Sequence, residues 1–255
     1  MLIKYLALGV VQGLTEFLPV SSSGHLVILQ KYLALDENGC LVGVMLHLGT
    51  LLAICLFFFN DITKIINDFL KRRNTKIVIY IAVVTLITGL CGILGRNFFE
   101  GLFASPRTVC LMLIATGAVL LATKKFINGR RNLLELNIKD ALWLGITQSL
   151  AIIPGISRSG ITISTLLFRD VNKESAFRFS FLASLPVILG AFILESTELG
   201  RVPRPVIVYL VAGTLLAFLS GLLALKILFH LIQKARFSFF GYYCLAIGLI
   251  FLFIL

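Results

Sequence analysis

The sequence predicts an all-α polytopic membrane protein. We expect an inverted repeat in which each half holds one re-entrant helical hairpin and three transmembrane helices, giving six spans in total. Three observations support this fold class: a very apolar composition, six long stretches with little or no charge, and two copies of one polar motif. The mean hydropathy is +1.00, and only 14% of the residues are charged, whereas soluble domains carry about 25%.

The predicted spans follow from the length of the apolar stretches, because crossing a bilayer takes about 20 residues. The six stretches are roughly 41–59, 77–95, 107–123, 179–194, 205–225 and 237–255. Two more apolar regions, 3–35 and 141–168, are interrupted near their middle by Pro, Gly and Ser. Such backbone is tolerated at membrane depth only where protein or a wet cavity surrounds it. We therefore expect two hairpins that each enter and leave on one side, with kinked spans as the alternative.

The distribution of basic residues predicts the orientation. The net charge of +11 could suggest a nucleic-acid partner, but the basic residues lie in short loops between the spans, so we expect no nucleic acid to bind. Most of them fall near 64–76, 124–139, 169–178 and 226–236. Loops rich in Lys and Arg stay in the cytoplasm. The first hairpin would then enter from outside and the second from the cytoplasm, with both termini outside.

An internal repeat links the two interrupted regions. Residues 8–24 (LGVVQGLTEFLPVSSSG) and 144–160 (LGITQSLAIIPGISRSG) align without gaps at an offset of 136, with seven identities in 17 positions. Three crossings in each copy would turn the second copy upside down. In inverted repeats, broken helices meet near the midplane and form the site. We predict one membrane domain, 1–255, with repeats of about 1–125 and 137–255.

The differences between the copies indicate the chemistry, whereas the shared serines and glycines indicate the scaffold. Glu16 aligns with Ile152, Ser22 with Arg158, and His25 with Ile161. Ionisable groups inside a membrane are costly and are functional candidates by default. Gln12 and Glu16 share a helix face because they are four residues apart. A carboxylate at that place can bind a hard cation or move a proton.

Arg158 stands between Ser157 and Ser159, a setting suited to phosphate because a guanidinium fork lies beside small hydroxyls and backbone N–H groups. Ser22 could attack phosphorus with His25 or Glu16 as its base, or His25 could attack directly. Other interpretations stay open: Glu16 could pair with Arg158 as a buried strut, and the serines could only cap helices. The residues alone favour an enzyme acting on a lipid phosphate, with a transporter of a phosphorylated solute or lipid nearly as well supported.

The remaining reactive side chains are expected to be structural. The cysteines are scattered without a CxxC pair, so we expect free thiols at Cys40, Cys55, Cys91, Cys110 and Cys244. His47 and His230 are isolated in the sequence and are expected to have structural or interfacial roles. Trp143 is expected to anchor the chain at the membrane interface.

The segment from Gln12 to His25 resembles the first signature of the bacterial undecaprenyl pyrophosphate phosphatase family, also called the bacitracin-resistance family. Pro154–Gly160 is similar to the second signature, and 176–191 matches the stretch that follows it. The resemblance covers essentially the whole chain in order and spacing. Gln12 is one of two residues that the family accepts at that position, which leaves a single carboxylate in the motif for a metal ion.

The resemblance implies hydrolysis of undecaprenyl diphosphate to undecaprenyl phosphate and inorganic phosphate, which recycles the lipid carrier for cell-wall synthesis. It also implies bacitracin resistance on overproduction, a divalent cation (Mg²⁺ or Ca²⁺) with Glu16 as metal ligand, and a place in the bacterial cytoplasmic membrane with the active site facing outward. Bilayer lipids surround such a protein, and a homodimer is a further expectation. The alternative is a transporter or flippase of a polyprenyl phosphate. By position, the resemblance assigns catalysis to Glu16, Ser22, His25 and Arg158, and substrate binding to Gln12, Ser21, Ser157, Arg158 and Thr162.

Overall fold

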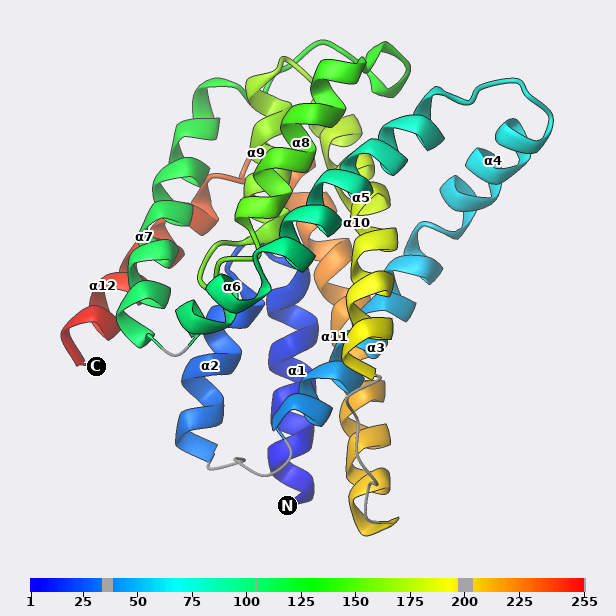
Figure 1. Ribbon diagram of the computed structural model, residues 1–255. Coiled ribbons are helices and arrows are strands. Elements are labelled where there is room, and N and C mark those ends of the chain that lie inside the picture. Colours follow the sequence, from blue (N-terminus) through cyan, green and yellow to red (C-terminus); the bar gives the residue numbers. More distant parts are fainter. Residues whose placement is uncertain (34–38, 104, 197–203, 255) are drawn as a thin grey trace.

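The computed structural model describes residues 1–33, 39–103, 105–196 and 204–254. This part of the chain is helical and contains no strand, apart from an isolated bridge between Arg131 and Val171 (Figure 1). The first half contains α1 (Leu2–Phe17), α2 (Ser22–Leu33), α3 (Gly39–Phe57), α4 (Phe59–Leu70), α5 (Lys76–Leu94), α6 (Arg96–Phe103) and α7 (Pro106–Ala122). Two short 3-10 turns follow, Thr123–Lys125 and Leu133–Glu135, and then α8 (Ile138–Leu150), α9 (Arg158–Phe168), α10 (Lys173–Ser196), α11 (Arg204–Gln233) and α12 (Phe239–Ile254).

The predicted membrane character is confirmed. Among the described residues, four helices are long and apolar enough to cross a membrane, namely α5, α7, α10 and α11. The pair α3 and α4 makes a fifth candidate if the two are counted as one span, although they are bent by 69°. The last predicted span, 237–255, contains α12, whose 16 residues fall just below the range of about 17–25 for a span. The structure thus supports four to five spans by length and composition.

Both predicted hairpins have the expected helix–break–helix form. The break between α1 and α2 spans residues 18–21, and the break between α8 and α9 spans 151–157. Residues 34–35 of the first predicted hairpin lie outside the described residues. Figure 1 shows the hairpins approaching from opposite ends of the bundle with their breaks in the middle. The breaks touch there, because the Gly155 N–H donates to Ser23 Oγ at 3.5 Å and a Cβ on Gly160 would lie 3.3 Å from Pro19 Cβ.

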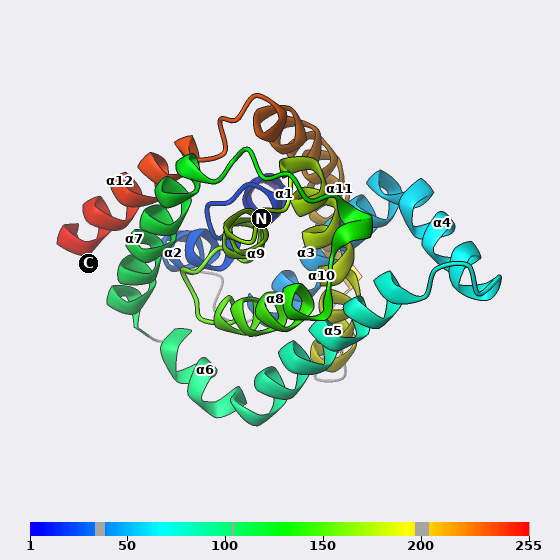
Figure 2. The ribbon, with the colours of Figure 1, turned by 90° about the horizontal axis from the view of Figure 1, so that it is seen from above.

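Small residues bring the helices around the hairpins close together. A Cβ on Gly9 would lie only 2.3 Å from the Gly213 carbonyl oxygen, so α1 packs directly on the backbone of α11. Gly117 of α7 and Gly241 of α12 face each other in the same way. Interfaces of small residues are typical of membrane helix pairs. Seen from above (Figure 2), α1, α2 and α9 lie toward the centre of the bundle, with α5, α6, α7, α11 and α12 around them, while α4 projects to one side.

A buried carboxylate joins the two ends of the second hairpin. Asp140, in the first turn of α8, is fully buried and accepts from Arg131 Nη2 at 2.5 Å. The guanidinium of Arg169, just beyond the end of α9, also donates to Asp140. The Arg131 N–H donates to the Asp170 carbonyl, which adds a backbone link. The base of the hairpin that carries Arg158 is therefore held by two ion pairs.

Candidate active site

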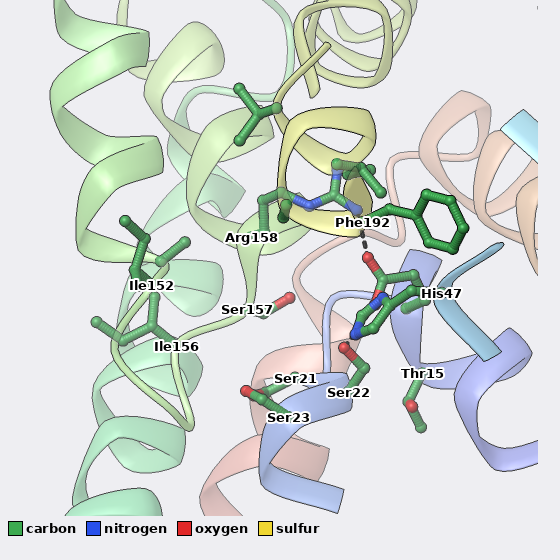
Figure 3. Close-up of a pocket in the computed structure, with 15 residues that line it drawn as sticks. Thr15, Ser21, Ser22, Ser23, His47, Ile152, Ile156, Ser157, Arg158 and Phe192 are labelled. Carbon is green, nitrogen blue, oxygen red and sulfur yellow. Dashed lines mark hydrogen bonds and ion pairs between the residues drawn. The ribbon is translucent and has the colours of Figure 1, made fainter. Parts of the chain in front are cut away.

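A cavity of about 240 Å³ lies where the two breaks meet (Figure 3). One part of its lining is polar: Thr15, Glu16, Ser21, Ser22, Ser23, His47, Ser157 and Arg158. The rest is apolar: Ala151, Ile152, Ile156, Val187, Ile188, Ala191 and Phe192. The polar side chains come from both hairpins and from α3, so the site depends on the fold bringing distant segments together. Its mixed lining suits a ligand with a charged end and an apolar body.

Glu16 is the centre of the polar wall. Its carboxylate is buried and accepts three hydrogen bonds: Oε1 accepts from Arg158 Nη2 at 2.6 Å, and Oε2 accepts from Ser22 Oγ at 2.7 Å and from Gln12 Nε2 at 3.1 Å. The Ser22–Glu16 contact places a hydroxyl directly on a carboxylate that can accept its proton. The pairing of Glu16 with Arg158, foreseen as a buried strut, is present, but it lies in the wall of an open cavity.

Arg158 retains hydrogen-bonding capacity toward an anion. Its Nη1 is buried and has no hydrogen-bond partner among the described residues, and a buried unpaired donor is costly. Arg158 is also the first residue of α9, and Ser22 is the first residue of α2. Two helix N-termini therefore lie at the cavity, where their backbone N–H groups and positive dipole ends favour negative charge. The free Nη1 and the two helix N-termini together favour a negatively charged ligand.

The serines shared by the two repeats build the breaks, as the repeat comparison suggests. Ser21 Oγ accepts from the Gly24 N–H at 3.3 Å, and Ser157 Oγ accepts from the Gly160 N–H at 3.1 Å. Each hydroxyl caps the helix that follows it. Both serines also line the cavity, so contact with substrate stays a prediction for them. The two breaks differ in backbone: Ser21 has φ of 68°, in the left-handed region, whereas Ser157 has φ of −78°.

Two other predicted substrate-binding residues stand behind the cavity wall. Gln12 is fully buried and donates through Nε2 to Glu16, while its Oε1 has no partner among the described residues. Thr162 is fully buried, donates to the Arg158 carbonyl oxygen at 2.6 Å and contacts the Ser180 hydroxyl. Neither residue is part of the cavity lining. The structure therefore gives Gln12 and Thr162 supporting positions behind Glu16 and Arg158.

His25, expected in the catalytic group, does not line the cavity. Its Nδ1 lies 2.8 Å from the Ser21 carbonyl oxygen, and its Nε2 lies 2.7 Å from the Tyr243 hydroxyl. The imidazole therefore contacts the backbone of the break and α12. The structure brings Glu16, Ser22 and Arg158 together without it.

His47 is a site residue that the sequence reasoning missed. It lies on α3, lines the cavity, and its Nδ1 is 3.1 Å from Gln12 Nε2 and 3.8 Å from Glu16 Oε2. Because Gln12 Nε2 can only donate, Nδ1 accepts and the ring proton sits on Nε2. Extending the offset of 136 beyond the loop would have paired His47 with Ala183, another unshared polar position. That signal was available in the sequence.

The described residues contain no group of three or more His, Cys, Asp or Glu side chains that could hold a metal ion. The carboxylate that faces the cavity is that of Glu16, whereas the unpartnered Gln12 Oε1 is buried behind the cavity wall. Mg²⁺ commonly takes one or two carboxylates and completes its shell with substrate phosphates and water. This donor set therefore fits a cation that is shared with a phosphorylated ligand better than a cation held by protein alone.

Comparison with known proteins agrees with the family that the motifs resemble. Residues 5–250 match the family described as bacitracin resistance protein BacA. A protein of Halothermothrix orenii named undecaprenyl-diphosphatase is 40% identical over 248 residues, covering 96% of this chain and 95% of its own. Similar matches come from Carboxydothermus hydrogenoformans, 40% identical over 250 residues (95% and 93%), and Thermotoga sp. strain RQ2, 41% identical over 245 residues (96% and 97%), both with the same name. The chain therefore belongs to the BacA bacitracin resistance protein family.

Proposed function

We propose that this chain is a membrane phosphatase that hydrolyses undecaprenyl diphosphate to undecaprenyl phosphate and inorganic phosphate. The observation that carries the proposal is the cavity, in which Glu16, Ser22 and Arg158 face an apolar wall within a helical membrane protein. A polyprenyl diphosphate has a charged head and an apolar tail, which matches both walls. The names of the relatives support the same substrate. The reaction returns the carrier lipid to cell-wall synthesis. Overproduction of the protein would therefore confer bacitracin resistance.

We also infer that the six-span inverted repeat underlies this site. The break of each half accepts a hydrogen bond from a helix of the other half. Cys244 of α12 donates to the Pro19 carbonyl at 3.3 Å in the first break. Thr116 of α7 donates to the Gly155 carbonyl at 3.1 Å in the second break. Pro19 and Gly155 occupy equivalent positions at the offset of 136. In the same way α1 packs on α11 while its counterpart α8 packs on α5. A crossing as short as α12 can be accommodated by thinning of the bilayer.

The proposed location is the bacterial cytoplasmic membrane, with the cavity accessible from the outer side. The basic loops at 64–76 and 124–139 support a cytoplasmic position for the opposite ends of the spans. We also propose that the chain forms a homodimer.

The mechanism that fits the geometry is in-line displacement with Ser22 as the nucleophile. Ser22 Oγ attacks the terminal phosphorus while its proton passes to Glu16 Oε2, 2.7 Å away. The bond between that phosphorus and the bridging oxygen breaks, and undecaprenyl phosphate leaves. Arg158 neutralises charge on the phosphate oxygens. Such stabilisation of the transition state supplies most of the catalysis in phosphoryl transfer. Water then attacks the phosphoserine, the phosphorus–Oγ bond breaks, and inorganic phosphate leaves with the protons of the water as Glu16 returns its proton to Ser22 Oγ.

Charge balance supports a divalent cation in this reaction. Glu16 cancels the single charge of Arg158, so the helix N-termini, each equivalent to roughly half a positive charge, supply the remaining positive field. A diphosphate needs more than that. We propose that the Glu16 carboxylate would help to hold Mg²⁺ or Ca²⁺ together with the substrate phosphates, and that a cation there would supply the remaining positive charge.

The test is release of inorganic phosphate from undecaprenyl diphosphate by the purified protein in detergent, with and without a chelator. We expect release that the chelator abolishes and that Arg158→Ala reduces to background while the variant still elutes as a folded protein. The alternative, a flippase, is favoured only by the opposed hairpins. A folded wild-type protein that moves a labelled polyprenyl phosphate across vesicles but releases no phosphate would replace the phosphatase proposal with that alternative.

A further inference from the structure

We propose that His25 is a positioning residue, fixed by Tyr243 of α12, that holds the backbone of Ser21 so that Ser22 stays on Glu16. This inference rests on the proposed function, because it assigns His25 a role in the same reaction. It removes His25 from the candidate nucleophiles and adds Tyr243 to the residues on which turnover depends.

The hydrogen bonds of His25 define its state. A carbonyl oxygen can only accept, so the Nδ1 that lies 2.8 Å from the Ser21 carbonyl carries the proton. In the neutral ring, Nε2 then accepts, and the Tyr243 hydroxyl at 2.7 Å donates to it. The two rings are also stacked, with centroids 5.8 Å apart and planes at 8°. Both ring nitrogens are thus occupied, and neither offers a lone pair to phosphorus.

The imidazole of His25 contacts Ser21, whose backbone has an unfavourable left-handed conformation. Ser21 has φ of 68°, which a residue with a side chain adopts at a cost of about 1–3 kcal/mol. The Ser21 carbonyl oxygen accepts from the His25 backbone N–H at 3.3 Å, and the His25 imidazole adds a second, shorter hydrogen bond to the same oxygen. Ser22 follows immediately, and its hydroxyl reaches Glu16 Oε2 at 2.7 Å. The direction of the proposed nucleophile therefore depends on a turn that His25 holds.

A neighbouring contact from the same helix supports this role independently. Cys244, next to Tyr243, is buried and donates through Sγ to the Pro19 carbonyl at 3.3 Å. Cys244 thus contacts the break directly at Pro19, and Tyr243 contacts it through His25, which reaches the Ser21 carbonyl. These contacts come from the far end of the sequence, so the position of Ser22 depends on the docking of α12.

The second repeat provides an internal comparison. Ser157, the counterpart of Ser21, has an ordinary φ of −78°. The counterpart of His25 is Ile161, which cannot form such a hydrogen bond. The imidazole thus occurs in the copy whose turn is strained and is absent from the copy whose turn is relaxed.

The decisive experiment compares His25→Asn with His25→Ala. The Asn amide nitrogen stands as many bonds from the backbone as Nδ1, so it can still donate to the Ser21 carbonyl. We expect Asn to keep kcat within about 10-fold of wild type and Ala to lower it about 100-fold, with KM changed less than about 3-fold in both. The Asn variant should retain the wild-type pH profile of kcat. Equal loss in both variants, or loss of one limb of the profile with Asn, would overturn the proposal.

Tyr243→Phe tests the other end of the contact, with Tyr242→Phe as the matched control on the same helix. Loss of one hydrogen bond should lower kcat about 5-fold at position 243 and leave it unchanged at position 242. In the His25→Asn background, Tyr243→Phe should have no further effect, because Asn does not provide Nε2. Additive effects, or equal effects at 242 and 243, would contradict the assignment.

Trapping of the phosphoenzyme distinguishes failure of the positioning role of His25 from failure of the proposed phosphatase activity. Phosphate found on His25 would refute the positioning role while leaving the phosphatase activity intact. A wild-type protein that releases no phosphate from undecaprenyl diphosphate would instead refute the proposed function. Phosphate on Ser22, together with activity of His25→Asn, is the result we expect.

Discussion

The guanidinium of Arg158 and the carboxylate of Glu16, 142 residues apart in the sequence, form an ion pair of 2.6 Å in the wall of the cavity. The pair satisfies two buried charges in the absence of substrate, which otherwise would be strongly destabilising. Phosphate oxygens compete with Glu16 for the same guanidinium. Substrate binding would thus free Glu16 from the guanidinium while the Ser22 hydroxyl stays hydrogen-bonded to Glu16 Oε2.

Arg158→Lys is expected to lower kcat/KM about 100-fold, although it preserves the charge. An ammonium group cannot form two parallel hydrogen bonds with a phosphate as a guanidinium does. Phosphate release at several substrate concentrations measures the effect. Arg130→Lys is the control, because the Arg130 side chain is 90% exposed on a loop, and it should match wild type. Activity of Arg158→Lys close to wild type would show that only the charge matters.

Glu16→Gln is expected to lower kcat about 100-fold to 10,000-fold, the range lost with a general base. The amide can still accept a hydrogen bond from Ser22 but cannot take its proton at neutral pH. Arg158 is freed from its ion pair, so binding of a non-hydrolysable analogue, measured with a chelator so that the proposed cation at Glu16 takes no part, should be retained or strengthened. A near-normal kcat would place the base elsewhere.

The sequence predicts the parts of the site that break a local pattern. Glu16, Ser22 and Arg158 are polar residues in apolar surroundings, and they differ between two otherwise similar loops, so they can be recognised without a structure. His47 and Tyr243 sit in apolar helices far from the motifs. Their roles depend on which helix packs beside the breaks, and that is set by tertiary packing. The separation of His25 from the cavity likewise depends on a backbone turn that residue order does not specify.

The hairpins were predictable for a similar physical reason. Pro19 and Gly155 interrupt apolar stretches that would otherwise continue as helices. The number of spans was harder to predict, because hydropathy does not locate a bend such as the 69° angle between α3 and α4, or the length at which α12 ends.

His47→Ala is expected to lower kcat about 5-fold with little change in KM, because Gln12 loses the hydrogen bond that orients its amide toward Glu16. His47→Asn should restore much of the loss, since its Oδ1 can accept from Gln12 in place of Nδ1. His230→Ala, at an exposed position near the end of α11, is the matched control and should be silent. If Asn were no better than Ala, His47 would have a role that its ring alone provides, such as carrying a proton.

Asp140→Asn is expected to destabilise the protein by about 3 kcal/mol at neutral pH, since it leaves Arg131 and Arg169 without their buried partner. Burial alone would raise the pKa of Asp140, but hydrogen bonds from Arg131, the Asn137 backbone and Arg169 hold that pKa below its usual value of 3.8. A depressed pKa contributes stability that is fully present above the unfolded value and is lost as the pH falls through the folded pKa.

Thermal unfolding in detergent between pH 7 and pH 3 therefore provides the measurement. Wild type should keep this contribution to about pH 5 and lose it below about pH 4, whereas Asp140→Asn should start lower and lack that acid-dependent loss. Asp170→Asn is the comparison, because Asp170 pairs at the surface with Arg130 at 3.6 Å and such pairs contribute about 0–1 kcal/mol. If both variants unfolded like wild type at pH 7, the Asp140 ion pairs would not hold the base of the hairpin that presents Arg158 to the cavity.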